Sequence, residues 1–153
     1  MQLIRQILCL GAFRNEMVHF WIVFCRSILE QACVVWHNSM TQENSDDIER
    51  LQKTFTKLIL KKEYVDYENA LLKLNLDTLA DRREQISLKF AKDGIKYNTL
   101  NDLLFKNENV KDLNRDVKNH ETYNVNFANT ERTRKSTVIY LQNLLNKEVS
   151  NKK

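Results

Sequence analysis

The residue types that could do chemistry are few in this 153-residue chain. Cys33 and His37 are four residues apart, so on one helix they would share a face and could supply half of a zinc site, but the two further ligands are missing. Cys25 could act as a nucleophile beside a histidine, yet no third group supports such a pair, and packing in a core is the favoured interpretation. We therefore predict no metal site and no cofactor in this chain.

Familiar catalytic motifs are absent as well. With two isolated glycines, neither a GxxxxGK[ST] nor a GxGxxG phosphate loop can be built, and no HExxH or GxSxG occurs. The acidic doublet Asp46-Asp47 falls at a predicted helix start, where the helix dipole is sufficient to explain it. No catalytic residue is predicted.

Basic side chains are the strongest functional signal in the sequence. They recur along the predicted helices 42–60 and 79–97, on the side opposite the apolar residues. Two such rows arranged side by side could follow a phosphate backbone without reading its sequence. The two rows and the basic C-terminal segment supply the candidate nucleic-acid-binding residues: Arg50, Lys53, Lys57, Lys89, Lys92, Arg132, Arg134 and Lys135.

The alternative is an ordinary solvated face. Asp46 with Arg50, and Glu49 with Lys53, have the i, i+4 spacing of ion pairs that stabilise a helix surface. Because charged outer faces are the norm for helices of soluble proteins, the residues alone favour this alternative.

The net charge of +4 is unevenly placed. Residues 123–153 carry six basic and two acidic side chains, an excess of four, which leaves 18 of each sign in residues 1–122. A basic tail favours an acidic partner such as a phosphate backbone. A terminus that merely keeps the chain soluble is an equally good interpretation.

Composition and spacing predict an all-α fold. The chain has no proline, two glycines and 29% charged residues, with apolar residues at helical spacing. We expect an irregular bundle of about six helices, built on an antiparallel hairpin of helices 16–36 and 42–60. Thr41 and Thr78 are expected to cap the helices that follow them. The other predicted helices are 2–10, 67–74, 79–97, 99–105 and 136–147.

We expect three parts along the chain. A helical domain covers 1–105, a polar linker covers 106–122, and a basic C-terminal segment with one helix covers 123–153. The linker has too few apolar side chains to build a core, and disorder is a natural expectation for it.

Helical spacing also predicts which side chains are inside. Ile28, Leu51 and Phe90 fall on apolar faces and are expected in the core. Arg83 lies nearer the apolar side of its helix than Arg82 does, so we expect it to pair with a carboxylate.

Cysteine usage indicates the compartment. The three cysteines form no CxxC and lie in apolar helical sequence, which favours reduced thiols in an intracellular protein of the cytoplasm or nucleus. No signal peptide is evident. The apolar run 17–25 falls short of the roughly 20 residues of a membrane span, so a buried helix and no membrane partner are predicted.

Three stretches, taken together, resemble a known family. They are residues 26–36, which contain RSILE and VW, residues 48–53 (IERLQK), and residues 67–83, which contain Tyr67, Ala70-Leu71 and Arg82-Arg83. Their order and spacing are similar to the region after the polymerase core in reverse transcriptases of jockey-like non-LTR retrotransposons. In that family an RS-[IV]-LE-YA-x-x-VW stretch precedes an LE-x-[VL]-QK helix, and a Y-x-x-AL segment ending in RR follows. A closing stretch with RTRKS at 132–136 and YLQNLLN at 140–146 also resembles the end of that region, so the resemblance covers roughly residues 11–147.

The resemblance implies a thumb-like, C-terminal portion of an RNA-directed DNA polymerase, with an endonuclease and a polymerase core upstream. The catalytic F/Y-x-DD motif is absent from this chain, no zinc knuckle follows, and Gln31 stands where the family usually has tyrosine. The implied partners are the backbone of template–primer RNA/DNA and the upstream polymerase core. This raises backbone binding above the solvated-face alternative.

Two other functions stay open. A structural bundle could dock on the polymerase core without binding nucleic acid, and it would need an exposed apolar patch, on residues 2–10 and 17–25. A decayed copy with no selected function is also compatible with the sequence.

Overall fold

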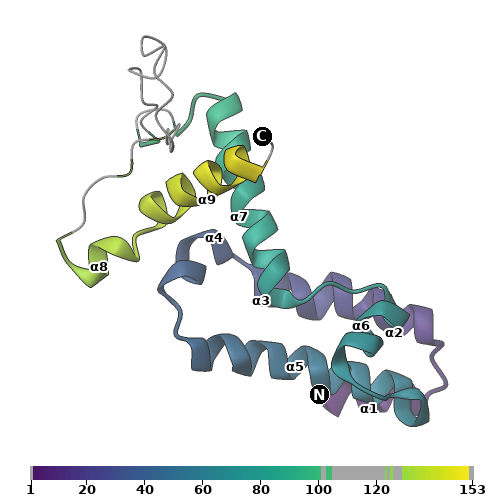
Figure 1. Ribbon diagram of the computed structural model, residues 1–153. Coiled ribbons are helices and arrows are strands. Elements are labelled where there is room, and N and C mark those ends of the chain that lie inside the picture. Colours follow the sequence, from purple (N-terminus) through teal and green to yellow (C-terminus); the bar gives the residue numbers. More distant parts are fainter. Residues whose placement is uncertain (1, 101–102, 105–122, 124, 126–128, 152–153) are drawn as a thin grey trace. The chain divides into compact units, whose positions relative to one another are not determined.

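The computed structural model describes residues 2–100, 103–104, 123, 125 and 129–151. These residues are mostly helical and include no strand, which confirms the predicted all-α class (Figure 1). The helical elements are α1 (Gln2–Cys9), α2 (Arg14–Phe20), the π-helix η1 (Trp21–Arg26), α3 (Ser27–Glu30), α4 (Cys33–Trp36), the 3₁₀ turn η2 (His37–Ser39), α5 (Gln42–Leu60), the 3₁₀ turn η3 (Lys61–Glu63), α6 (Tyr67–Leu74), α7 (Leu79–Lys96), α8 (Glu131–Arg134) and α9 (Thr137–Asn151).

The described chain forms two compact units. Unit 1 comprises Met1–Cys33 and Met40–Arg83, and unit 2 comprises Val34–Ser39 and Glu84–Lys153. Helix α7 begins in unit 1 and continues into unit 2. The predicted linker 106–122 lies outside the described residues, so the division into 1–105, 106–122 and 123–153 stays a prediction.

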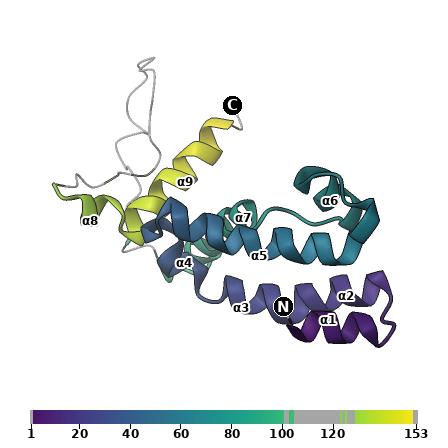
Figure 2. The same ribbon diagram turned by 90° about the horizontal axis from the view of Figure 1, so that it is seen from below.

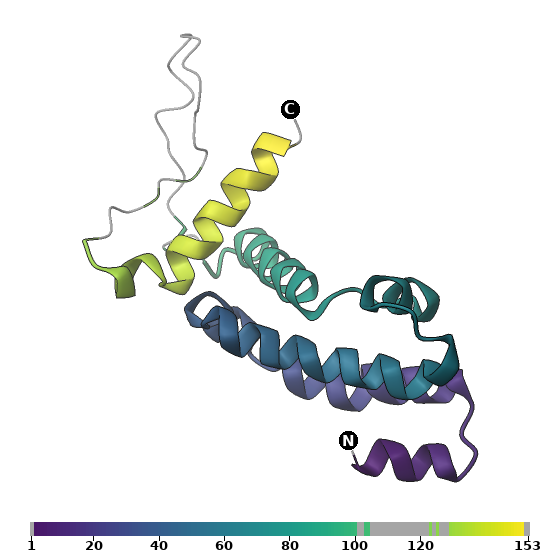
Figure 3. The ribbon, with the colours of Figure 1, turned by 60° about the horizontal axis from the view of Figure 1, so that its bottom comes forward.

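In unit 1, α5 lies beside the α2–η1–α3 segment and runs in the opposite direction (Figure 1 and Figure 3). The Trp21 and Phe55 rings stack between them with their centroids 4.4 Å apart. Helix α1 lies alongside α2 (Figure 2), and its Ile4 joins the same buried cluster. Helix α5 has the predicted bounds and cap, because Thr41 Oγ1 accepts a hydrogen bond from the Asn44 backbone N–H at 3.3 Å.

The prediction of one continuous helix over 16–36 is wrong. The helix ends at Glu30, Ala32 takes a φ of 51°, and α4 begins at Cys33. The π-helix also changes the register, since its turns hold more residues than α-turns and rotate everything that follows around the axis. Ile28 is therefore turned outward with 71% of its surface exposed, against the prediction.

A buried polar layer joins α5 to the segment before α7. Gln52 is fully buried. Its Oε1 accepts from Trp21 Nε1 at 3.3 Å, and its Nε2 donates to the Tyr67 hydroxyl at 3.2 Å and the Asp77 carbonyl at 2.8 Å. Each partner left unsatisfied by a truncation would cost about 1–3 kcal/mol. Leu51, expected in the core, is 41% exposed, because the register of α5 is set by Gln52.

Glu49 extends this layer to the start of α7. The Leu79 backbone N–H donates to both of its carboxylate oxygens, at 3.3 and 3.1 Å, and the Tyr67 hydroxyl also donates to it. A carboxylate is stabilised at this helix end by the partial positive charge of the dipole. Thr78 caps the same helix as predicted, with its Oγ1 accepting from the Asp81 N–H at 3.1 Å.

Two arginines complete the layer. Arg83, 1% exposed, donates from Nη2 to Ser45 Oγ at 3.0 Å. Burial lowers the pKa of Arg83, and the negative charge of Glu49 opposes that change. The expected pairing of Arg83 with a carboxylate stays a prediction. Arg82 donates from Nε and Nη2 to the two oxygens of Glu30, at 3.0 and 3.3 Å. These contacts join α3, α5 and the first turn of α7 within unit 1.

Unit 2 is built on the packing of α9 against α7. Leu141 and Leu145 share a buried cluster with Ala91. Asn146 holds Tyr123 by two hydrogen bonds, accepting from its N–H at 2.9 Å and donating to its carbonyl at 3.0 Å. Phe90, expected in the core, is 47% exposed, because the adjacent Ala91 faces the cluster instead. The described residues at 99–105 form turns and bends where a helix was predicted.

Gly94 is expected to resist substitution. A Cβ there would lie 2.2 Å from Leu100 Cδ1 and 3.1 Å from Leu100 Cβ, and the Leu100 N–H is held by the Gly94 carbonyl at 3.2 Å. Gly94→Ala should therefore lower the free energy of unfolding by about 1–3 kcal/mol, although helix propensity alone predicts a gain. Chemical denaturation measures the loss. In a Leu100→Ala background Gly94→Ala should cost less stability than it does in the unaltered protein. A stabilised Gly94→Ala variant would contradict this packing.

The polar layer of unit 1 can be tested through pH. Burial raises the pKa of the Tyr67 hydroxyl well above its ordinary value of about 10, and the neighbouring Glu49 carboxylate raises this pKa further. The resulting stability is fully present below pH about 10 and is lost as pH rises towards the folded-state pKa, because the unfolded chain then ionises first. In urea unfolding above that pH, Tyr67→Phe should lose stability less steeply than the unaltered protein. Tyr97→Phe, which removes an exposed hydroxyl, is the matched control, and equal slopes for all three proteins would refute the burial effect.

Candidate nucleic-acid interface

Three of the predicted binding residues lie on one face of α5. Arg50, Lys53 and Lys57 are all exposed and recur at i, i+3 and i+7, within roughly a quarter of a turn. The buried residues Gln52, Phe55 and Ile59 of α5 lie on the opposite side of the helix. The contacts of that buried side fix the rotation of α5, so the three cations are held towards solvent.

The N-terminal half of this face is nearly neutral. Arg50 Nη1 lies 2.8 Å from Asp47 Oδ1. Arg50 and Lys53 also line an open depression of about 280 Å³ together with Asp46, Glu49 and Tyr67. Carboxylates of opposite sign therefore accompany both cations at close range, which weakens their attraction for an anion.

The C-terminal half of the face is different. The ammonium of Lys57 lies 5.4 Å from the centroid of the Tyr64 ring, a cation–π distance, and it makes no ion pair with another described residue. Lys61 and Lys62 follow directly in η3 and are also exposed. Positive charge without carboxylate partners therefore gathers at this end of α5.

In unit 2 the α7 row is partly engaged in structure. Lys89 is exposed and forms no ion pair with the part of the chain that is described. Lys92 Nζ lies 2.5 Å from Glu148 Oε1 of α9, and Lys147 of α9 lies 3.4 Å from Glu84 of α7. Lys92 thus helps to hold α9 on α7, and Lys89 is the more available of the two predicted cations.

The three predicted cations of the C-terminal segment lie in and beside α8. Arg132 and Arg134 are exposed on this one-turn helix, which Thr130 caps through its Oγ1. Lys135 pairs with Glu131 at 2.9 Å, and this pair lowers the pKa of the Glu131 carboxyl. Arg132 and Arg134 form no ion pair with a described carboxylate, although the charge of Arg134 also helps to lower the pKa of Glu131.

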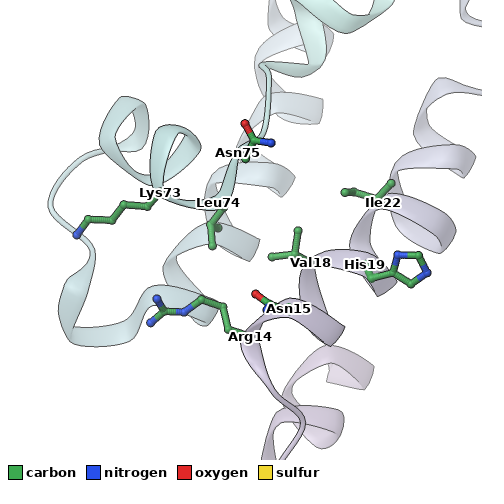
Figure 4. Close-up of a pocket in the computed structure, with 8 residues that line it drawn as sticks. All are labelled: Arg14, Asn15, Val18, His19, Ile22, Lys73, Leu74 and Asn75. Carbon is green, nitrogen blue, oxygen red and sulfur yellow. The ribbon is translucent and has the colours of Figure 1, made fainter.

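Sequence reasoning missed a pocket of about 380 Å³ in unit 1 (Figure 4). Val18 and Ile22 point from the α2–η1 side towards Leu74 at the end of α6, and Arg14 and Lys73 stand at the rim. Arg14 pairs with Glu63 at 2.7 Å, and Lys73 Nζ donates to the Glu63 carbonyl at 3.1 Å. Both rim cations are thus already bound to one residue, which makes this pocket a weak anion site. Only tertiary structure brings residues so distant in sequence together.

The residues considered for metal binding have other surroundings. Cys33 is buried in unit 1, and the His37 ring packs edge-on against Tyr140 in unit 2, with centroids 5.7 Å apart. No group of three or more His, Cys, Asp and Glu side chains that could hold a metal ion occurs in the described residues.

Among the described residues, no single helix is long and apolar enough to cross a bilayer. The bent pair Arg14–Glu30 and Cys33–Ser39 meets these two criteria together.

Comparisons of the chain with protein-family models, with curated proteins and with solved structures find no match.

Proposed function

We propose that this chain is a non-catalytic, thumb-side segment of a retrotransposon RNA-directed DNA polymerase that holds template–primer nucleic acid by its backbone. The carrying observation is the fixed, outward-facing row of Arg50, Lys53 and Lys57 on α5, whose Lys57 end makes no ion pair with a described residue. A row of cations on a rigid helix suits the regularly spaced phosphates of a nucleic-acid backbone. The row has no pattern of side chains that would recognise particular bases. The resemblance of residues 11–147 to the post-polymerase region supports the same function.

The exposed cations of unit 2 support the proposal independently. Lys89, Arg132 and Arg134 are exposed and without carboxylate partners among the described residues. Because backbone binding releases condensed counterions, its affinity should fall steeply with salt. A surface in which every cation were paired would show little such dependence.

Charge reversal tests this function. Changing Lys53, Lys57 and Lys89 together to Glu should weaken binding to an RNA–DNA duplex by about tenfold or more. It should also flatten the plot of log affinity against log salt by about one unit for each phosphate that the variant no longer neutralises. Fluorescence anisotropy at several salt concentrations measures both quantities.

A second triple variant, with Arg14, Lys73 and Lys147 changed to Glu, alters net charge equally at exposed positions outside the proposed interface. It should lose much less affinity. Equal losses of affinity in the two variants would show that net charge alone causes the loss. An unchanged salt slope in the first variant would contradict the proposal.

An exposed apolar row favours a second candidate function, docking on a polymerase core. Phe24 is 58% exposed and Ile28 is 71% exposed, and the half-buried Phe20 ring lies 5.0 Å from the Phe24 ring. Such a row on a helix surface is a natural contact for another apolar face. Part of it lies in the stretch 17–25 where the sequence placed an apolar patch for this function.

Docking predicts that this row promotes association of the isolated chain. Phe24→Ser with Ile28→Ser should markedly lower both the binding of an apolar dye and any self-association seen in sedimentation velocity. Leu72→Ser is the control, because Leu72 is 83% exposed but lies on α6, away from that row. A control that lowers dye binding as much as the double variant would leave the row without a special role.

A further inference from the structure

A second pocket of unit 1 lies between α1 and the end of α5, with a volume of about 400 Å³. Arg5, Leu8 and Cys9 recur at helical spacing on one face of α1 and form one wall. Lys57, Leu58 and Lys61 form the other wall. We refer to this site as the α1–α5 pocket.

The rim of the α1–α5 pocket is cationic. Arg5, Lys57 and Lys61 are exposed, and none of them makes an ion pair with a described residue. In the described chain no carboxylate lines the pocket. In the pocket of Figure 4, by contrast, the two rim cations Arg14 and Lys73 are already bound by Glu63. Three like charges around one opening raise the local potential and attract an anionic partner.

The backbone holds one of these cations in an uncommon conformation. Lys61 has a φ of 47° and a ψ of −111°, a region that residues with a Cβ seldom occupy. Such strain is typical of ligand clamps and persists only where the surrounding structure enforces it. A glycine would adopt this conformation without strain, but it would leave the rim without its third charge.

The floor of the pocket is apolar and aliphatic. Leu8 and Leu58 are half-buried and face the opening together with the Cys9 thiol. No aromatic ring lines the pocket among the described residues, so a nucleobase would find no aromatic stacking platform there. An apolar side chain flanked by negative charges matches both the floor and the rim.

We propose that the α1–α5 pocket binds an acidic peptide segment that inserts one large apolar side chain between Leu8 and Leu58. Carboxylates on either side of that anchor meet Arg5, Lys57 and Lys61. The pocket volume suits one such side chain rather than a folded domain. This binding goes beyond the proposed grip on nucleic acid, with which it shares Lys57, and gives unit 1 a protein partner of defined chemistry.

Two labelled peptides test the anchor. In one, acidic residues flank a central leucine; in the other, alanine replaces that leucine. Fluorescence anisotropy with the full chain should show about tenfold tighter binding of the leucine peptide, since the anchor buries an apolar side chain. Equal affinities for the two peptides would reduce the interaction to charge and overturn the proposal.

Charge reversal tests the rim without touching Lys57, which also belongs to the nucleic-acid row. Arg5→Glu with Lys61→Glu should weaken the leucine peptide by about tenfold or more. The matched control is Lys62→Glu with Lys73→Glu, two exposed lysines that do not line this pocket. The control should retain most of the affinity, and equal losses in both variants would overturn the site. Circular dichroism confirms that each variant is folded, and Arg5→Gln with Lys61→Gln replaces any that is not.

Alkylation of Cys9 shows where the peptide binds and needs no substitution in the chain. It is exposed in the pocket, whereas Cys25 is half-buried and Cys33 is buried. The leucine peptide should slow alkylation of Cys9 several-fold in mass spectrometry, and the alanine peptide should not. Protection by an RNA–DNA duplex or by anionic phospholipid vesicles, with none from the leucine peptide, would assign the pocket to those partners and overturn the proposal. A chain that binds the peptide but no duplex would refute the proposed function alone.

Discussion

The carboxylate of Glu49 and the amide of Gln52, one turn of α5 apart, hold unit 1 together. Together they accept hydrogen bonds from Trp21, from the Tyr67 hydroxyl and from the first N–H of α7. Gln52 also donates hydrogen bonds to the Tyr67 hydroxyl and the Asp77 carbonyl. Polar groups in a core tolerate no shift of register, because a displaced partner would be left buried and unsatisfied. An apolar stripe alone would allow α5 to rotate or slide at smaller cost. The polar layer therefore specifies both the rotation of α5 and the place where α7 begins.

This constraint also fixes what α5 presents to solvent. With Gln52 inward, Lys53 and Lys57 face outward, and the acidic first turns leave the uncompensated charge at the C-terminal half. The helix thus has a neutral half and a cationic half on a single face. The proposed nucleic-acid row and the α1–α5 pocket both draw on the cationic half and meet at Lys57. Binding of one partner near Lys57 would then affect the other, through charge if not through direct overlap.

Local sequence signals predicted much of this fold. Thr41 and Thr78 are capping residues at the start of well-formed amphipathic stretches, so the bounds of α5 and α7 followed from one-dimensional patterns. The break at Ala32 did not, because neither glycine nor proline marks it, and the π-helix that rotates Ile28 outward leaves no trace in composition. Gln52 resembles a surface residue until Trp21, Tyr67 and Asp77 surround it. For the same reason the cations of α5 could be listed from sequence, whereas the α1–α5 pocket could not, since it needs residues from two helices far apart in the chain.

The proposed grip on nucleic acid depends on one inference, that the cationic half of α5 is the surface on which unit 1 meets the phosphate backbone. Amide chemical shifts of the isotopically labelled chain, followed by NMR during titration with an RNA–DNA duplex, provide the decisive test. We expect shifts concentrated around residues 53–61 of α5 and η3 that fade as salt is raised. Shifts confined to the exposed apolar row around Phe24 and Ile28, or no shifts at low salt, would refute this inference.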